Sequence, residues 1–359
     1  MALNKILPAL AVTVFIGGCS TGAYYSQAVS GHLKLMNARQ DVATLLESPD
    51  LDATLREKLE LSKEIRAFAS AELGLPDNGS YKSFVKTGRD FVTWNVIAAG
   101  EFSVDAKTWC FPVAGCVSYK GYFDKEAAEK QAAELTADGY DTVVTGATAY
   151  STLGWFDDPL LDTMLTGHEL RLAGLIFHEL AHQKLYLKGD SDFNEAYATF
   201  VEQQGVRTWL TASDRQYQLQ AYGEFLQRRE QFAELLLNAR EKLQALYDSE
   251  ISDDEKRQGK QAVFAEMRAD YQIMKDQWQG YAGYDRWFEQ EINNARLVAA
   301  ATYRRLVPAF AALFNEQGGE FPAFYRRAAE LSTMNKTERE TVLAGLVGSE
   351  MPAASVSAR

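Results

Sequence analysis

The sequence provides little that would bind nucleic acid or form a fibre. Only 37 of its 359 residues are Lys or Arg, against 49 Asp or Glu, which gives a net charge of −12. No block of basic residues supplies the phosphate contacts that nucleic-acid binding requires. The 25 glycines and 8 prolines are too few for a collagen-like chain or a long low-complexity linker. Apolar residues make up 47% of the chain, so it can bury a sizeable core as one large domain or as two or three smaller ones.

After the N-terminal segment, no apolar stretch of the chain reaches the length of a bilayer span. Lys5 precedes an apolar run over residues 6–16, which has the length of a signal-peptide core. The run ends in Ile16–Gly17–Gly18–Cys19, which resembles a bacterial lipobox. The resemblance implies a signal peptide over residues 1–18 and lipidation of Cys19. An ordinary secretory signal with a chance cysteine is the alternative.

The residue after Cys19 refines the expected address. It is Ser20 rather than Asp, which by resemblance to Gram-negative lipoproteins favours the outer membrane. We therefore expect a protein of the bacterial cell envelope that faces the periplasm and is held to the membrane by its lipid anchor. Nucleic acid is not expected as a partner, and the sequence leaves protein partners open.

Cysteine is rare, and beyond Cys19 only Cys110 and Cys116 occur. The five residues between them include Pro112 and Gly115, so the chain can bend back there. Because the periplasm is oxidising, we expect a disulfide between them, with two buried thiols as the alternative. Two cysteines alone do not complete a tetrahedral zinc site, so no metal is expected here.

Hydrophobic spacing predicts a mainly helical chain with a short sheet-forming part. Apolar residues at three-to-four spacing predict helices over residues 20–75 and almost everywhere after Leu170. β-Branched and aromatic residues predict strands within 89–123 and from Thr142 to Ala149, around a helix over 126–138. Amphipathic patterns over 214–248 and from a capping box at Ser252–Glu255 onward predict a helical hairpin.

Histidine is scarcer than in most chains of this size: the four are His32, His168, His178 and His182. Two of them lie in the motif His178–Glu179–Leu180–Ala181–His182. On a helix, residues four apart share one face, so both imidazoles can bind one metal ion. Glu179 points elsewhere and can hold a water without binding the metal, which is the division of labour in zinc hydrolases. His32 and His168 are expected at the surface.

A third ligand is expected on the helix that follows. Gly189 is predicted to end the zinc-binding helix, and Asp190 or Ser191 can cap an antiparallel helix over 192–210. At a rise of about 1.5 Å per residue, Glu195 stands near the height of His182, and Glu202 near that of His178. The spacing alone leaves either carboxylate as the third ligand.

Resemblance distinguishes the two carboxylates. The run Phe193–Asn194–Glu195–Ala196–Tyr197–Ala198, continued to Glu202, resembles the Asn-Glu-x-x-Ala helix of gluzincin zinc peptidases. The resemblance implies that Glu195 is the third zinc ligand and that Glu202 supports the ligands from behind. Residues 149–210, with 109–123 and 292–295, are similar to a family of bacterial lipoproteins classed as zinc aminopeptidases. This similarity covers most of the mature chain.

The resemblance implies an α+β fold, mainly α, with a zincin-like core built from the small sheet, the HExxH helix and the third-ligand helix. The expected regions are a signal peptide (1–18), an N-terminal helical region (19–88), the catalytic core (89–210) and a C-terminal helical region (211–350). Zn²⁺ is the expected cofactor, peptides are the expected substrates, and Glu179 is the expected general base of peptide-bond hydrolysis.

The sequence departs from the family pattern in two ways that bear on the activity and residue roles implied by the resemblance. The interval between His182 and Glu195 is shorter than in well-known gluzincins, so the two helices must turn at once. The Gly-x-Met-Glu-Asn strand that binds the substrate amine in the related aminopeptidases is replaced by Gly146–Tyr150, which has no Glu. Hydrolysis is therefore better supported than aminopeptidase activity. Candidates for the amine-binding group are Glu101, Asp157 and Asp158.

Further roles are left with several candidates. The hydroxyl that stabilises the oxyanion is expected from one of five tyrosines: Tyr150, Tyr271, Tyr281, Tyr284 and Tyr303. Residues 149–159 are expected either as an edge strand that pairs with substrate or as a rigid loop on the zinc helix.

Two alternative functions are a lipoprotein scaffold with a structural zinc, using 214–278 as its partner-binding arm, and a zinc amidase acting on cell-wall peptides. An open cleft that exposes Glu179 would favour the enzyme over the scaffold.

Overall fold

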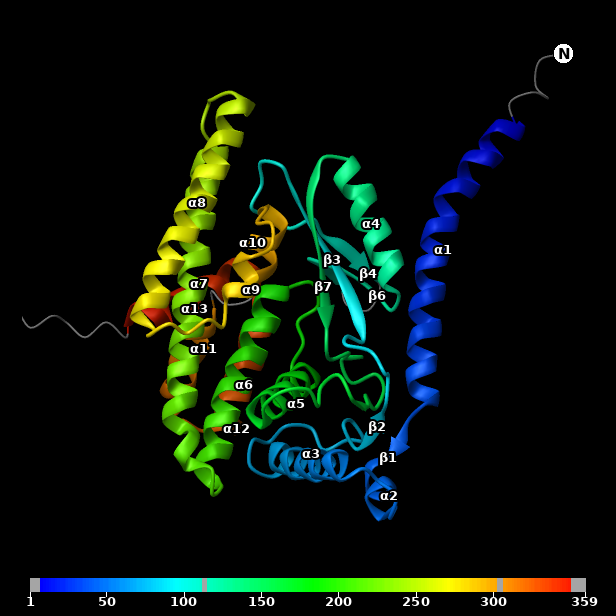
Figure 1. Cartoon of the computed structure of the whole chain (residues 1–359), viewed down its shortest axis with the longest axis vertical. Coiled ribbons are helices and arrows are strands. Elements are labelled where there is room, and N and C mark those ends of the chain that lie inside the picture. The colour runs from blue at the N-terminus through cyan, green and yellow to red at the C-terminus, as the bar shows by residue number, and fades with distance from the viewer. Residues whose placement is uncertain (1–6, 112–114, 302–305, 350–359) are drawn as a thin grey trace, which may run out of the picture.

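Helices dominate the structure, and the strands labelled β3, β6 and β7 lie in its middle (Figure 1). The structure is a computed structural model that describes residues 7–111, 115–301 and 306–349. The fold is α+β and mainly α, as the sequence predicts. The helices before and within the catalytic segment are α1 (Leu7–Asn37), α2 (Val42–Glu47), α3 (Ala53–Ala71), α4 (Lys125–Ala137), α5 (Glu169–Lys184) and α6 (Ser191–Ala212).

The C-terminal part is mainly helical and has no strand among its described residues, as expected. A short 3-10 turn, η1 (Gln216–Gln218), leads into the predicted hairpin of α7 (Leu219–Tyr247) and α8 (Asp253–Gln277). The capping box of Ser252 and Glu255 starts α8, which confirms that prediction. The remaining helices are α9 (Asp285–Phe288), α10 (Asn294–Ala301), α11 (Val307–Glu316), α12 (Phe321–Thr333) and α13 (Lys336–Ser349).

Three small sheets contain the strands. The central sheet has the order β6-β3-β7, and the other two have the order β1-β2-β8 and the pair β4-β5. The strands are β1 (Gln40–Asp41), β2 (Ser83–Val85), β3 (Thr93–Gly100), β4 (Trp109–Phe111), β5 (Gly115–Val117), β6 (Lys120–Tyr122), β7 (Tyr140–Ala147) and β8 (Leu160–Leu161). Strands β3 and β7 pair antiparallel along their whole length, from Thr93 opposite Ala147 to Gly100 opposite Tyr140.

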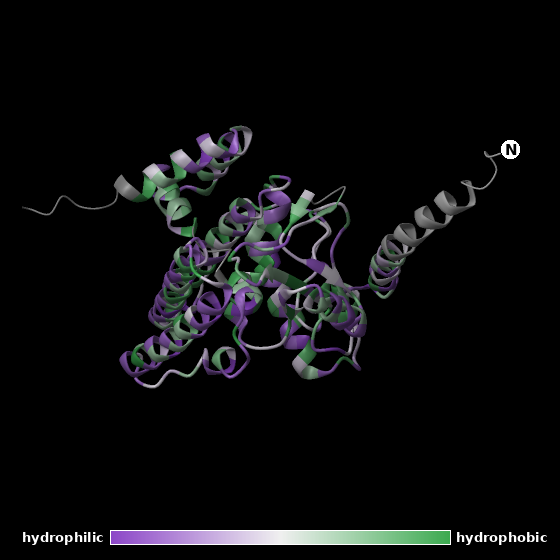
Figure 2. Ribbon diagram, turned by 90° about the horizontal axis from the view of Figure 1, so that it is seen from above, coloured by the Kyte–Doolittle hydropathy of each residue, from purple (hydrophilic) through white to green (hydrophobic). Residues whose placement is uncertain are grey.

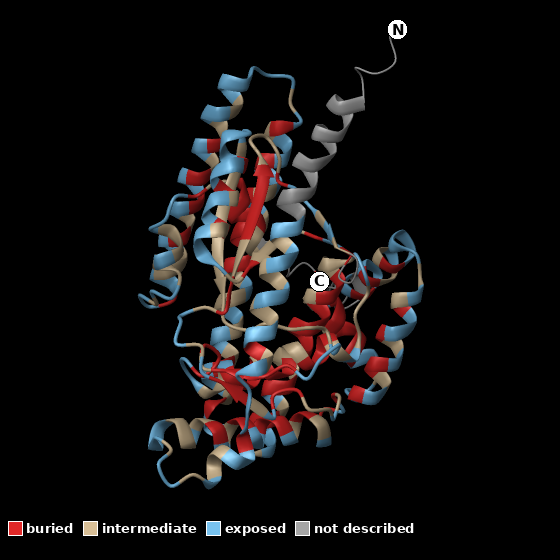
Figure 3. Cartoon of the chain, turned by 90° about the vertical axis from the view of Figure 1, so that its right-hand side faces the viewer, coloured by how far each residue is buried: buried red, intermediate tan, exposed pale blue. Residues whose placement is uncertain are grey.

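The central sheet is covered on both faces because its side chains alternate along β3. Val96 and Ala98 pack against α4, whereas Ile97 and Ala99 pack against Ala295 and Val298 of α10. Figure 3 shows buried residues along this sheet and in the helices below it, with α1 lying in front, where its coloured part combines exposed and intermediate residues. Hydrophobic residues concentrate toward the middle of the molecule and hydrophilic residues on the outer helices (Figure 2).

The largest buried cluster joins parts of the chain that are far apart in sequence. It contains side chains of α3, α5 and α6 together with side chains of α11, α12 and α13. A second cluster lies between α7 and α8 and includes Ile292 and Leu297. Most apolar side chains of the α7–α8 hairpin are therefore buried within this molecule, whereas Phe225 and Ile273 are 41% and 58% exposed.

Two expectations about local structure are corrected, and one open alternative is decided. The region 20–75 is not continuously helical, because it is interrupted by β1 and by turns around α2. Of the two alternatives for residues 149–159, the structure shows the loop and not the edge strand. Helix α5 ends at Lys184 and not at Gly189, because Leu187 exchanges hydrogen bonds with the side chain of Asn194 (Leu187 N to Oδ1 2.7 Å, Nδ2 to Leu187 O 2.7 Å).

The N-terminal expectations are only partly within the described chain. Residues 1–6 of the expected signal peptide lie outside the described residues, and lipidation of Cys19 stays a prediction. Helix α1 begins at Leu7 and therefore includes residues 7–16 of the apolar run. Among the helices that the structure describes, none combines the length and apolarity needed to cross a membrane.

Candidate metal site and cleft

Two neighbouring helices bring the three predicted ligands together. His178 and His182 lie one turn apart on α5, and Glu195 lies in the first half of α6. Helix α6 begins after Asp190, whose side chain accepts a hydrogen bond from Phe193 N (3.1 Å), as predicted for a cap. Glu195 lies between the imidazoles, with Oε2 3.4 Å from His178 Nε2 and Oε1 3.6 Å from His182 Nε2.

This group fits a metal ion. One donor atom from each of His178, His182 and Glu195 lies within 4.8 Å of the other two. The imidazole rings are 4.8 Å apart and nearly perpendicular, so their nitrogens can approach one point from different directions. Two imidazole nitrogens and one carboxylate oxygen are the donor set of catalytic zinc sites that keep a position open. The residues therefore could bind a metal ion, and of the two carboxylates left open by spacing, Glu195 is the one within this group.

Glu202 lies behind His178. Its Oε2 is 3.2 Å from His178 Nδ1, and its Oε1 accepts a hydrogen bond from Arg229 Nη1 of α7 (2.9 Å). Gly174 allows this approach, because a Cβ there would lie 3.1 Å from Glu202 Cγ. Arg229 carries no local signal in the sequence, since it lies 27 residues after Glu202 and on another helix.

The ionisable side chains of this group and of Glu202 shift one another's pKa values. Burial lowers the pKa of His178, but hydrogen bonds to Glu195 and Glu202 outweigh it and raise the pKa well above the usual range. Burial lowers the pKa of His182 to about 4, so this imidazole is neutral near pH 7 and can bind a metal. Burial alone would raise the pKa of Glu202, and Arg229 with His178 lowers it to about 2.

Glu179 faces a cleft beside the predicted ligands. Burial, followed by the charges of Glu195 and Asp158, raises the pKa of Glu179 to about 7 despite the opposing effect of His178. The cleft has a volume of about 670 Å³ and is bordered by α1, the central sheet, the loop after β7 and the two metal-site helices. A carboxyl group with a pKa near neutrality at such a place is suited to taking up and releasing protons.

Of the five tyrosines expected as candidates for stabilising the oxyanion, the structure places one at the cleft. Tyr150 lines the cleft, whereas Tyr271, Tyr281 and Tyr284 belong to the α7–α8 cluster, and Tyr303 lies outside the described residues. Tyr119 and Tyr186 also line the cleft and were missed. Burial, followed by the charge of Glu195, raises the pKa of both. Tyr119 lies within the segment 109–123 that is similar to the family, a signal that pointed to it.

The candidates for binding a substrate amine lie elsewhere, because none of the three lines the cleft. Glu101 forms an ion pair with Arg257 of α8 (2.7 Å). Asp157 accepts a hydrogen bond from Gly79 N (3.0 Å). Asp158 is fully buried, and its Oδ2 accepts a hydrogen bond from Thr152 N (2.9 Å).

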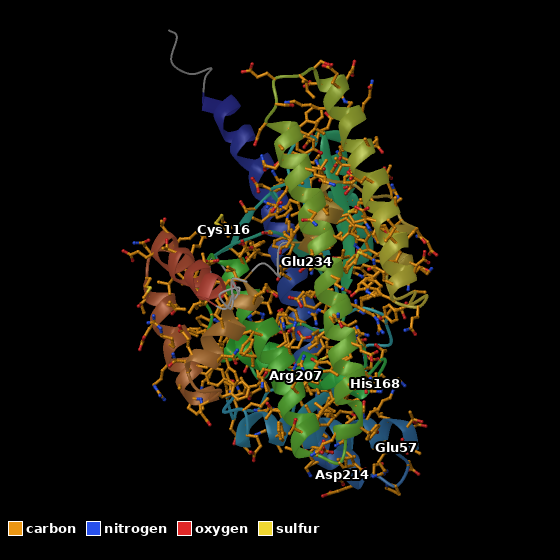
Figure 4. All side chains as sticks on the ribbon, turned by 90° about the vertical axis from the view of Figure 1, so that its left-hand side faces the viewer. Glu57, Cys116, His168, Arg207, Asp214 and Glu234 are labelled. Carbon is orange, nitrogen blue, oxygen red and sulfur yellow. A yellow bond between two sulfur atoms is a disulfide. The ribbon has the colours of Figure 1, made fainter. Side chains whose placement is uncertain are left out.

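The remaining predicted residues have structural roles. Cys110 and Cys116 form the expected disulfide across β4 and β5, a hairpin whose residues Phe111 and Val117 line the cleft (Figure 4, Cys116 labelled). His168 is the N-cap of α5, since its Nδ1 accepts a hydrogen bond from Leu170 N (3.3 Å). The ring of His32 lies 4.7 Å from that of Phe156 in the loop after β7.

The fold and site thus define a mainly helical α+β protein with a His–Glu–x–x–His helix and a group that could bind a metal ion beside a cleft. The model of the family described as "Putative aminopeptidase" matches residues 23–343, so the chain belongs to this family. Neither the curated proteins nor the solved structures gave a match. The family name indicates a peptidase.

Proposed function

We propose that the protein is a zinc-dependent peptidase of the aminopeptidase type, with His178, His182 and Glu195 as zinc ligands and Glu179 as general base. The observation that carries this proposal is the convergence of the three donor groups within 4.8 Å beside a cleft onto which Glu179 opens. Membership of the family described as an aminopeptidase supports cleavage next to the N-terminal residue of a peptide.

Each residue has a distinct task in this proposal. A zinc ion held by the three ligands would supply a Lewis acid for the peptide carbonyl and lower the pKa of the attacking water. The Glu179 carboxylate takes the proton of that water and gives it to the nitrogen of the leaving amine. Tyr119, Tyr150 and Tyr186 offer hydroxyl donors to the carbonyl oxygen as it gains negative charge. Glu202 accepts the Nδ1 proton of His178, which leaves Nε2 free for the metal.

We also propose that the protein works at the periplasmic face of the bacterial outer membrane, anchored by a lipid on Cys19. The support is the lipobox-like run that ends at Cys19 and the Ser20 that follows it. The disulfide between Cys110 and Cys116 favours an oxidising compartment.

The scaffold alternative gains no support from the described residues. It would require an exposed apolar face on the α7–α8 hairpin, and most of that face packs against residues such as Val104 and Ile292. It would also leave the cleft beside Glu179 without a use.

Metal content and hydrolysis test the proposal together. A soluble form of the chain from Ser20 onward, after zinc loading, should contain about one zinc per chain by mass spectrometry of the metal, and His182→Ala should lose it. Glu179→Gln should retain zinc and lose about 10²- to 10⁴-fold in kcat on peptide substrates, because only the proton transfer is removed. A parent chain without stoichiometric zinc, or Glu179→Gln with full activity, would refute the proposal.

A further inference from the structure

Helix α1 forms one wall of the cleft. Tyr24 and Ala28, four residues apart on one face of α1, line the cavity together with Asn95 of β3 and Ser151 of the loop after β7. The helix lies in front of the central sheet in the view from its own side (Figure 3). The part of the chain that follows the predicted anchor therefore borders the space in which a substrate must lie.

Specific contacts fix this wall in place. The side-chain oxygen of Gln27 accepts a hydrogen bond from Phe123 N (3.0 Å). The ring of Tyr24 stacks on Phe111 (5.7 Å) and meets Tyr122 edge-on (5.4 Å). Gly31 allows the helix to approach the sheet, because a Cβ there would lie 2.2 Å from the ring of Phe123. Aromatic pairs and a backbone hydrogen bond of this kind stabilise a docked helix and do not suit a loose one.

The wall limits the space beside the metal site. The cavity of about 670 Å³ includes the volume next to His178, Glu179 and His182. Cavities of about 300–1,000 Å³ enclose ligands of drug size, which corresponds to a peptide of a few residues. Ala28 is the small residue of the α1 wall, so a larger side chain there would project into the cavity.

On the basis of the proposed function, we propose that the substrates are short peptides of about two to five residues. Tyr24 and Ala28 of α1 set this limit by closing one side of the cleft. The recognised class is thus free peptides, and folded proteins or long unfolded chains are poor substrates because α1 blocks their path past the metal site.

A series of peptides of increasing length tests the limit. The peptides share their first two residues and extend from two to twelve residues, and kcat/KM is measured for each with the zinc-loaded soluble chain from Ser20 onward. We expect kcat/KM to fall at least tenfold beyond about five residues. A value that stays within threefold up to twelve residues would overturn the inference.

Two variants on adjacent residues of α1 test whether this helix sets the limit. Ala28→Trp fills the cavity and should lower kcat/KM for a tetrapeptide at least tenfold, with a smaller loss for a dipeptide and unchanged zinc content. Val29→Trp is the matched control, because Val29 is 56% exposed on the outer side of the helix, and it should leave both values within twofold. Ala28→Leu replaces Ala28→Trp if the larger residue prevents folding, and should give a loss of the same kind.

The outcomes separate this inference from the proposed function. A parent chain that hydrolyses no peptide of any length refutes the proposed function and this inference with it. Hydrolysis that ignores peptide length, or equal losses in the Ala28 and Val29 variants, refutes the inference alone.

Discussion

The predicted ligands are held by side chains from several helices. Glu202 contacts His178 from α6, and Arg229 of α7 holds Glu202 by its other oxygen. Partners of this kind orient an imidazole and fix which nitrogen carries the proton. The site thus depends on a helix that lies outside the segment containing its motifs.

A buried acid in the loop after β7 gives a prediction about pH. Burial raises the pKa of Asp158 from 3.8 to about 6 in the folded chain. The folded state therefore binds a proton more tightly than the unfolded state, and this group makes the chain less stable as pH rises from about 4 to above 6. The full penalty above pH 6 is about 3 kcal/mol.

Asp158→Asn should remove this penalty. At pH 8 the variant should unfold with a free energy about 1–3 kcal/mol higher than the parent, and near pH 4 the gain should vanish. Urea unfolding of both chains at pH 4, 6 and 8, in the same metal state, measures the difference. A variant that is less stable than the parent at pH 8 would show that the Asp158 carboxylate is compensated when charged.

At the scale of elements, the sequence predicts helices and motifs better than the turns between them. The i, i+4 spacing of His178 and His182 places both on one face, and the structure confirms α5, α6 and the hairpin of α7 and α8. The end of α5 was wrong because Asn194, from the next helix, binds Leu187 and stops the helix early. A contact between two elements leaves no local pattern that a single sequence could reveal.

The residues of the site that lie on the two motif helices could likewise be predicted from the sequence, whereas those contributed by other elements could not. Glu195 and Glu202 have the heights that helix geometry gives them, and resemblance assigned their order. Arg229, Tyr119 and Tyr186 come to the site through tertiary packing, which periodicity does not encode. Glu101 is a poor candidate for binding a substrate amine because Arg257 already binds its carboxylate. This partner lies 156 residues further along the chain, so the sequence holds no local sign of it.

The disulfide hairpin of β4 and β5 gives a prediction at this scale. The bond between Cys110 and Cys116 closes a short loop with a sequence separation of 6, so its removal should cost only about 2 kcal/mol. Because Phe111 and Val117 line the cleft, the double variant Cys110→Ser/Cys116→Ser should raise KM while zinc content stays at the parent value. Reduction of the parent with a phosphine should reproduce this effect. Loss of zinc in the double variant would instead place the hairpin in support of the metal site.

At the scale of the whole molecule, one core connects the two ends of the chain to the metal site. Side chains of α3 and of α11–α13 pack in the same cluster as α5 and α6. The C-terminal helices therefore support the helices that carry the predicted ligands. We expect the chain to lose its metal site and its C-terminal helices in a single unfolding step.

Arg339 of α13 is the sharpest test of this connection. Its buried guanidinium binds Asp190, the cap of α6, and lies 5.3 Å from the ring of Phe193. Arg339→Met leaves Asp190 without its cation, and removing one partner of a buried pair costs about 3–5 kcal/mol. Arg327→Met is the control, since the side chains of the Arg327–Glu330 pair on α12 are 33% and 62% exposed and the pair contributes at most about 1 kcal/mol. Urea unfolding followed by tryptophan fluorescence and by zinc release should show coincident transitions, shifted together in Arg339→Met. Zinc release at the parent's urea concentration in that variant would mean that α13 is stabilised separately from the metal site.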